Sequence, residues 1–291
     1  MDLRAIEFFS GIGGWRYAMN GLNGLGRVVS AYDISEIANS VYKLNFGDSP
    51  TVRELATIPV GEIRALAANA WLMSPPCQPF CRMGKSLGLN DARAAAFIHL
   101  MGLLIEARPQ RFVLENVEGF LESEGFELLA QRLNDISLRW RCISACPTRF
   151  GIPNRRPRVY VAASAHGVRN DVLPLIEPSP LFNYLDTDED ESLYLSPETT
   201  ARHGPGLDLA TPESRSSACF IGGYGKRFVG GGSFLKTNKG VRRFSPGEVS
   251  RLLGYPPGFR FPDGIPLNKQ YKLLGNGLNI AVAEWVLGQL D

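Results

Sequence analysis

Short apolar runs alternate with segments of helical spacing along the first 165 residues of the chain. Each run is predicted to be a β-strand, and the runs are LRAIEFF, RVVSAYD, AWLMS, RFVLENV, RCISACP and RVYVAAS. Helices are predicted from Trp15, over 35–44, near 93–107 and near 126–138. Such alternation is typical of a doubly wound α/β domain with a mainly parallel sheet. The predicted fold class is therefore α/β.

The alternation stops after about Gly167. Residues 168–243 are rich in Pro, Gly, Ser and charged residues and have no regular period. The segment nevertheless contains many aromatic residues, namely Phe182, Tyr184, Tyr194, Phe220, Tyr224, Phe228 and Phe234. Solvated linkers hold few aromatic residues. The pattern therefore favours a small irregular second domain over a disordered linker.

The last part of the chain returns to helical patterns. A helix is predicted to begin at Ser245, because Ser245 can cap it, Pro246 suits its first position and Glu248 completes a capping box. The final segment GNGLNIAVAEWVLGQL has helical apolar spacing, so we expect it to pack back on the α/β domain. These features predict a first domain of residues 1–166 plus 266–291 and a second domain of residues 167–265.

Composition excludes several classes of protein. Hydrophobic residues make up 44% of the 291 residues and charged residues 21%, as in ordinary globular proteins. The sequence has no apolar stretch long enough to span a membrane, and its start MDLRAIEFFSG lacks the pattern of a signal peptide. Five cysteines in a chain of this length do not form a disulfide framework. We expect a cytoplasmic protein with reduced thiols and no membrane partner.

Charge is unevenly distributed, although the net charge is only +2. Residues 214–247 hold seven basic residues and no acidic one, and residues 136–158 hold six arginines and no acidic residue. Acidic residues concentrate instead in DTDEDE at 186–191. This segregation favours a basic face for a polyanion. The alternative is a solvated surface on which basic residues cluster by chance.

The segment FFSGIGGW follows the first predicted strand and opens a helix. Glycines at such a turn let a ligand approach backbone N–H groups closely, although the spacing is not that of the GxGxxG motif. Asp33 ends the second predicted strand, where a carboxylate can bind the hydroxyl pair of a ribose. Together they indicate a nucleoside-containing cofactor. A tight structural turn and a surface aspartate are the alternative.

The stretch SPPCQPFC places Cys77 just after a predicted strand, between prolines that fix the backbone. Ligands bind at the carboxyl ends of strands in open parallel sheets. A thiol held in this way suits a nucleophile, whereas a lone cysteine is often only buried. Cys77 and Cys81, like Cys142 and Cys146, are four residues apart. That spacing and the scattered His99, His166 and His203 do not suggest zinc, so we expect no metal.

Two further strand ends carry polar groups. Glu115 ends the predicted strand RFVLENV, so it can share the sheet edge with Cys77. A carboxyl group there can donate a proton or a hydrogen bond to a ring nitrogen. Arg156 and Arg158 occupy alternate positions of an incipient strand and should point to the same side. Two guanidinium groups can hold a carbonyl oxygen and a phosphate, although a charge pair on an edge strand is an alternative.

These motifs together resemble the cytosine-C5 methyltransferases. The chain contains, in order, an FxGxG segment, PPCQPF, ENV, an RxR strand and LLGNGLN. MSPPCQPF, GIPNRRPR and CFIGGYGKRF resemble the tRNA (cytosine-38-C5)-methyltransferase branch, also called type-2 DNA methyltransferase homologues. Ile221 replaces the branch's Thr, and Arg227 stands where its second Tyr is expected. Asn154 replaces the Gln that most DNA-acting relatives carry, as it does in the tRNA branch.

The resemblance implies a Rossmann-like domain that binds S-adenosylmethionine and a small target-recognition domain. It implies that the Cys77 thiolate attacks C6 of cytosine, that Glu115 binds N3 and the exocyclic amine, and that Arg156 and Arg158 steady the base and the sugar-phosphate. The cofactor would contact Phe9, Gly11, Ile12, Gly13, Gly14, Asp33, Ile34, Leu55, Ser74, Pro75 and Asn276. The nucleic acid would contact Cys219, Phe220, Tyr224, Lys226 and Arg227, with Phe220 and Tyr224 available for stacking.

The implied substrate is cytosine-38 in the tRNA anticodon loop, in tRNA-Asp or a related tRNA such as tRNA-Glu. A base in that loop is already unpaired, so extruding it costs little. A DNA cytosine-C5 methyltransferase is the first alternative, but the second domain is short for reading several base pairs. The second alternative is a non-catalytic nucleic-acid-binding protein with the same fold. We expect a monomer that uses DNA, if at all, as a poor substrate.

Overall fold

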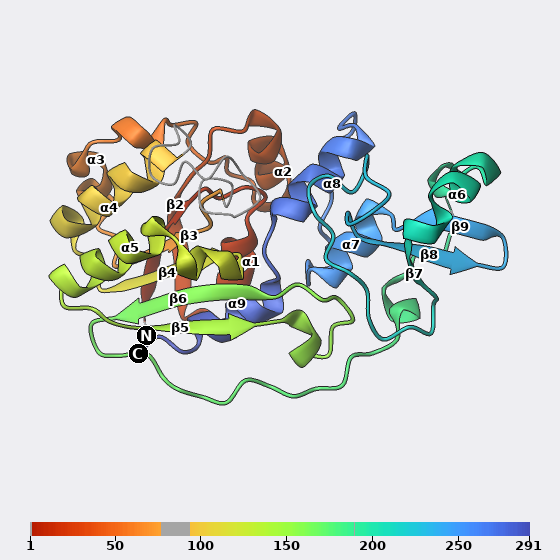
Figure 1. The fold of residues 1–291 in the computed structure, drawn as a ribbon. Coiled ribbons are helices and arrows are strands. Elements are labelled where there is room, and N and C mark those ends of the chain that lie inside the picture. The colour runs from red at the N-terminus through yellow and green to blue at the C-terminus, as the bar shows by residue number, and fades with distance from the viewer. Residues whose placement is uncertain (1, 77–93, 189) are drawn as a thin grey trace.

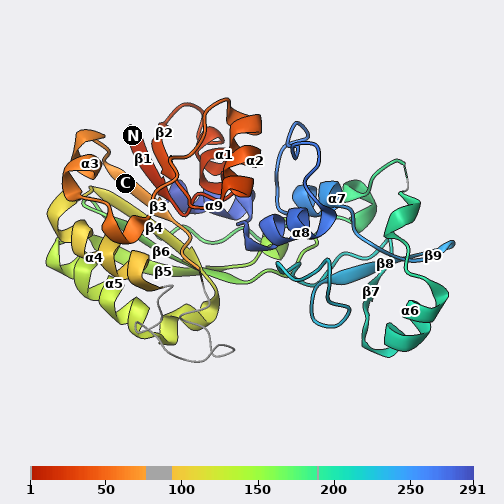
Figure 2. The same ribbon diagram turned by 90° about the horizontal axis from the view of Figure 1, so that it is seen from above.

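The computed structural model describes residues 2–76, 94–188 and 190–291. Cys77 and Cys81 lie outside these residues, so the predicted nucleophile remains a prediction from the sequence. Figures 1 and 2 show a large lobe that holds both chain termini and a smaller lobe beside it.

A six-stranded sheet forms the centre of the large lobe, with the order β2-β1-β3-β4-β6-β5. Its strands are β1 (Leu3–Phe8), β2 (Gly26–Tyr32), β3 (Ala70–Met73), β4 (Arg111–Asn116), β5 (Arg139–Ala145) and β6 (Arg158–Ser164). The first four strands along the chain pair in parallel, whereas β6 runs antiparallel to both β4 and β5. The predicted α/β class and strands are confirmed. The strand order reverses at β1, between β2 and β3, where open α/β sheets bind ligands.

Helices cover both faces of this sheet (Figure 2). They are α1 (Gly14–Asn20), α2 (Glu36–Phe46), α3 (Val60–Ala65), α4 (Ala95–Ala107), α5 (Glu124–Asp135) and α9 (Ile280–Leu287). Alternate strand residues supply separate cores: Leu3 and Ala5 belong to the core that contains α1, α2 and α9, and Ile6 and Phe8 to the core with α4 and α5. The apolar runs in the sequence reflect burial on both faces.

Short 3-10 helices connect the main elements. They are η1 (Leu55–Thr57), η4 (Glu118–Glu122), η5 (Pro147–Arg149), η6 (Leu181–Tyr184), η7 (Glu191–Leu193) and η8 (Gly204–Gly206). None of the helices in the described part of the chain is long and apolar enough to cross a membrane.

The small lobe contains a three-stranded sheet in the order β7-β8-β9. Its strands are β7 (Asp208–Ala210), β8 (Ser233–Thr237) and β9 (Gly240–Arg243), and the helices nearby are α6 (Pro197–His203), α7 (Pro246–Leu252) and α8 (Leu267–Asn276). Ser245 caps α7 with the complete capping box predicted from the sequence. The region predicted to be irregular therefore holds a small sheet, whose strands are too short to produce a clear periodic signal.

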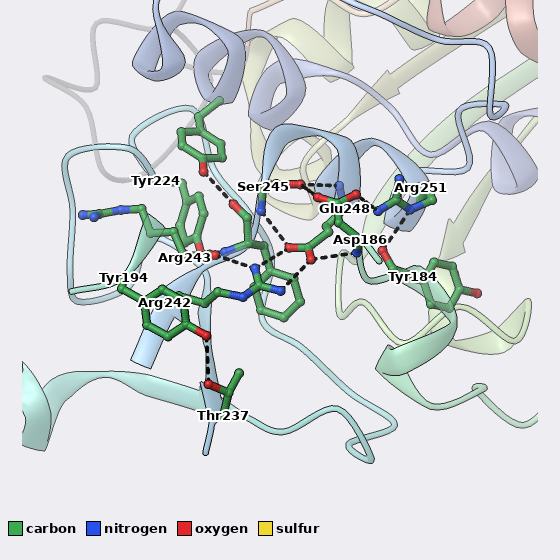
Figure 3. A network of polar contacts seen from close by, with 12 residues as sticks. Tyr184, Asp186, Tyr194, Tyr224, Thr237, Arg242, Arg243, Ser245, Glu248 and Arg251 are labelled. Carbon is green, nitrogen blue, oxygen red and sulfur yellow. Dashed lines mark hydrogen bonds and ion pairs between the residues drawn. The ribbon is translucent and has the colours of Figure 1, made fainter. Parts of the chain in front are cut away.

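A buried ion pair stabilises the small lobe (Figure 3). The guanidinium of Arg242 donates to both carboxylate oxygens of Glu248, over 2.7 and 2.8 Å, and Glu248 has no exposed surface. The backbone N–H groups of Ser245 and Asp186 donate to the same carboxylate over 2.7 and 3.0 Å. Because these four donors all reach the Glu248 carboxylate, its buried charge is compensated.

Helix α8 joins the lobes rather than belonging to one of them. The ring of Tyr271 packs edge-on against Tyr224 with 5.0 Å between centroids, and the hydroxyl of Tyr271 donates to the Phe244 carbonyl over 2.6 Å. A Cβ atom on Gly275 would lie 2.2 Å from the backbone nitrogen of Gly222, so only glycine allows this approach. The domain boundary predicted at residue 266 therefore falls beside a helix that packs on the small lobe.

Candidate active site

A cavity of about 750 Å³ opens at the carboxyl ends of β1, β3 and β4, and α8 lies at its edge. Most of the predicted site residues line it: Phe9, Gly11, Ile12, Gly14, Asp33, Ile34, Leu55, Ser74, Pro75, Glu115, Arg156, Arg158 and Asn276. The cavity thus brings together side chains from both ends of the chain, at the switch point of the strand order.

Asp33 is held rigidly on one wall of the cavity. The backbone N–H of Gly11 donates to its Oδ2 and that of Ser35 to its Oδ1, each over 2.8 Å. Burial raises the pKa of Asp33, and the N–H groups of Ser35 and Gly11 partly offset that rise. Each oxygen keeps a lone pair for a further donor, so the carboxylate is oriented to accept hydrogen bonds from a ligand.

Open space and apolar surface lie beside this carboxylate. Gly11 adopts φ +54°, and a Cβ added to it would meet no atom within 4 Å. The Ser10 hydroxyl oxygen is buried and has no hydrogen-bond partner in the described part of the chain. Ile34 leaves 65% of its surface exposed, and Leu55 is buried on the same cavity wall. The wall can therefore accept a ligand with both polar and apolar parts.

Glu115 and Arg158 form an ion pair inside the cavity, with 3.1 Å between Nε and Oε1. Glu115 pairs with Tyr160 across the antiparallel strands β4 and β6, so Arg158 lies on the same face as Glu115. Burial disfavours the charge of Arg158, but the Glu115 carboxylate and the Cys219 thiol more than compensate and raise the pKa of Arg158. Among the residues that the structure describes, the second oxygen of Glu115, Oε2, has no ion-pair or hydrogen-bond partner.

The contacts of Arg156 differ from the expectation that it steadies the base and the sugar-phosphate. Its side chain is 3% exposed, and its terminal nitrogens donate to protein atoms: the Cys219 sulfur and Phe220 carbonyl, each over 3.3 Å, and the carbonyls of Gly275 and Gly277. Burial and the nearby Arg158 charge lower the pKa of Arg156. A guanidinium occupied in this way does not reach a sugar-phosphate. It instead anchors the end of α8 to the segment that contains Phe220.

The backbone that precedes Cys77 is held from two sides. The indole N–H of Trp15 donates to Ser74 Oγ over 3.0 Å, and the Asn116 amide donates to the Pro75 carbonyl over 3.2 Å. Ser74 and Pro75 follow β3 directly, so the backbone is positioned up to the last described residues before Cys77. Stable positioning of this kind is what a nucleophile requires.

The predicted substrate contacts lie outside the cavity wall, as does Gly13, the N-cap of α1. Phe220 is 3% exposed and Tyr224 has no exposed surface, which corrects the expectation that their rings are available for stacking. The Tyr224 hydroxyl donates to the Ser233 carbonyl over 2.7 Å and accepts from Phe244 N–H over 2.9 Å. These rings form the core of the small lobe. Lys226 and Arg227 are exposed.

Several residues of the cavity are not predicted by the sequence patterns. Glu7 and the exposed Lys269 and Lys272 line it, as does Asn116, which donates to the Pro75 carbonyl. Glu7 has a visible signal, because it places a charge between the apolar Ile6 and Phe8 on a buried strand. Lys269 and Lys272 carry a weaker signal, since exposed lysines on a helix are common. In the described part of the chain, no cluster of three or more potential metal ligands occurs.

A family model for the C-5 cytosine-specific DNA methylases matches residues 3–201 and 211–291. The chain belongs to this family. It is a cytosine-C5 methyltransferase that uses S-adenosylmethionine and acts on cytosine in a nucleic acid. The predicted family and cofactor are thereby confirmed.

Two curated relatives and one solved structure are similar over nearly the whole chain. The human tRNA (cytosine(38)-C(5))-methyltransferase is 29% identical, with 96% of this chain and 97% of the relative covered. The enzyme of the same name from Schizosaccharomyces pombe is 30% identical, with 99% and 96% covered. The structure of the Entamoeba histolytica methyltransferase EhMeth is 30% identical and has a TM-score of 0.94, with 99% and 98% covered.

Proposed function

We propose that the protein methylates C5 of cytosine-38 in the anticodon loop of a tRNA. The similarity to two enzymes named for this reaction, over 96% and 99% of the chain, carries the proposal. The second domain predicted at residues 167–265 is short for reading several base pairs, which favours this substrate over duplex DNA. tRNA-Asp is the first substrate to test, and tRNA-Glu the second.

The residues of the cavity fit S-adenosylmethionine, which supplies the methyl group when it is bound. Asp33 would accept hydrogen bonds from the ribose hydroxyls, because its two oxygens are already oriented by Gly11 and Ser35. Ile34 and Leu55 offer apolar surface to the adenine. The space at Gly11 and the unpartnered Ser10 hydroxyl suit the methionine part. Phe9, Ile12, Gly14 and Asn276 complete the proposed contacts.

Glu115 and Arg158 have distinct proposed tasks toward the cytosine. Glu115, which lines the cavity, would bind N3 and the exocyclic amine of the base with its carboxyl group. Arg158 would hold the Glu115 carboxyl in that orientation. The Cys77 thiolate would add to C6, which makes C5 nucleophilic. Arg156 is a positioning residue, because its contacts fix the backbone around Cys219 and Gly277.

The test is methyl transfer from tritiated S-adenosylmethionine to matched substrates. We expect label in a tRNA-Asp transcript at a rate far above that in duplex DNA, and little label when cytosine-38 is replaced by uridine. Cys77→Ala should abolish transfer. Faster labelling of duplex DNA would favour the DNA methyltransferase that the family description itself suggests. If the enzyme neither binds nor methylates tRNA or duplex DNA, both the tRNA and the DNA methyltransferase functions are excluded.

A further inference from the structure

Helix α8 presents two lysines at the mouth of the catalytic cavity. Lys269 and Lys272 both line it and are exposed, as is Asn276 one turn further on. Spacings of three and four residues place all of them on one face of the helix. Among the residues that the structure describes, neither lysine has an ion pair or a hydrogen bond to a carboxylate, and residues 264–283 include no acidic residue.

The helix has little freedom to turn these lysines elsewhere. Tyr271 and Leu274 are buried on its opposite side, and Tyr271 is tied to the Phe244 carbonyl. Gly275 rests against the backbone of Gly222, and Arg156 donates to the Gly275 carbonyl over 3.2 Å. The packing that buries one face of α8 therefore holds the lysine face toward the cavity and solvent.

A second pair of cations adjoins the first. Lys226 and Arg227 are exposed on the segment that packs along α8. A Cβ on Gly225 would lie 3.2 Å from the Cα of Asn268, and one on Gly222 would lie 3.4 Å from the Lys272 carbonyl oxygen. The segment 214–247 that carries this second pair is free of acidic residues in its sequence. Positive charge thus extends from the cavity mouth onto the small lobe.

We propose that Lys269 and Lys272 bind the backbone phosphates beside the target nucleotide and hold the RNA strand over the cavity. The proposal rests on the proposed tRNA substrate. A nucleotide that enters the cavity leaves its flanking phosphates at the mouth, where these ammonium groups lie. Phosphate contacts of this kind fix the register of a nucleic acid without reading its bases. Lysine suits the task because its flexible stem carries a compact positive charge.

The test compares Lys269→Gln/Lys272→Gln with a variant that loses the same charge elsewhere. Lys43→Gln/Arg132→Gln serves as the control, because both residues lie on helices outside the cavity wall. Two single-strand phosphate contacts contribute roughly 1.4 to the slope of log affinity against log salt, which corresponds to about tenfold in affinity near 0.15 M salt. We expect the KM for tRNA to rise about tenfold and the salt slope to fall accordingly.

The same variant should leave binding of S-adenosylhomocysteine, measured by calorimetry, at the wild-type level. Lys269→Arg/Lys272→Arg should restore most of the affinity for tRNA, which a merely structural role for the lysine stems would not require. A wild-type KM and salt slope in the double Gln variant overturn the proposal. Loss of S-adenosylhomocysteine binding also overturns it, because the lysines would then serve the cofactor. If the wild-type enzyme does not methylate tRNA, the tRNA substrate and this RNA contact are both refuted. If the wild-type enzyme methylates tRNA and the KM of Lys269→Gln/Lys272→Gln is unchanged, only the lysine contact is refuted.

Discussion

Glu7 makes the stability of the protein depend on pH. Its carboxyl group has no exposed surface and accepts hydrogen bonds from the Trp15 N–H over 3.2 Å and the Tyr42 hydroxyl over 3.1 Å. Burial raises the pKa of Glu7 from its ordinary 4.5 to about 8, although those hydrogen bonds act in the opposite direction. The folded protein therefore retains a proton near neutral pH that the unfolded chain releases.

The sign and size of the effect follow from this difference in pKa. The contribution of Glu7 to the free energy of unfolding is fully present below the unfolded pKa and is lost as the pH rises through the folded pKa. Each pH unit between the two values removes about 1.4 kcal/mol. Between pH 5 and pH 8 the loss amounts to roughly 3 kcal/mol, which is a large part of the stability of a typical domain.

Glu7→Gln removes the titration and keeps a side chain of similar shape, whose amide oxygen can still accept from Trp15. We expect the variant to gain stability relative to the wild type by roughly 3 kcal/mol from pH 5 to pH 8. Urea unfolding at several pH values measures this difference directly. Glu36→Gln, at an exposed carboxyl in the first turn of α2, is the control and should show no such trend. Parallel stability curves for wild type and Glu7→Gln would refute the reasoning.

Three further predictions concern the cavity and the small lobe. Asp33→Ala should weaken binding of S-adenosylhomocysteine by roughly ten- to a hundredfold, because hydrogen bonds to a charged group are lost. An unchanged affinity in calorimetry would show that Asp33 does not bind the cofactor. Glu115→Gln should lower kcat by roughly 10²–10⁴-fold with the cofactor affinity retained, as expected when a positioned acid–base group is lost; near-normal turnover would exclude it as the group that binds cytosine N3. Arg242→Met should destabilise the small lobe by about 3–5 kcal/mol in urea unfolding, because it leaves Glu248 buried without its cation. Arg242→Met/Glu248→Leu should recover much of that loss. A single variant as stable as the wild type would show that the ion pair contributes little to stability.

The sequence predicts the large lobe well because its signals are local. The strand runs are apolar on both faces, so β1 to β6 are recognisable without knowing which helix covers which face. Asp33 and Glu115 were also accessible to prediction, since each ends such a run. The small lobe was not, because β7 to β9 are short and β7 pairs with a strand far along the chain, Asp208 with Ser233.

The errors at the site have the same physical origin. The RxR pattern predicts a substrate contact at Arg156, but its partners Gly275 and Gly277 are more than a hundred residues away in the sequence. The resemblance predicts that Tyr224 is available for stacking, whereas its ring packs against Phe220, Phe234 and Tyr271. An aromatic residue in a polar, glycine-rich segment gives no local sign of whether it faces solvent or a core. Long-range packing decides that question.

Bisulfite sequencing of tRNA after incubation with the enzyme and S-adenosylmethionine tests the central claim most directly, because it reports the chemical change at each cytosine. The proposed function predicts that cytosine-38 of tRNA-Asp becomes resistant to conversion with the wild-type enzyme and stays sensitive with Cys77→Ala. Unmodified cytosine-38, together with new resistant cytosines in duplex DNA treated in parallel, would contradict it.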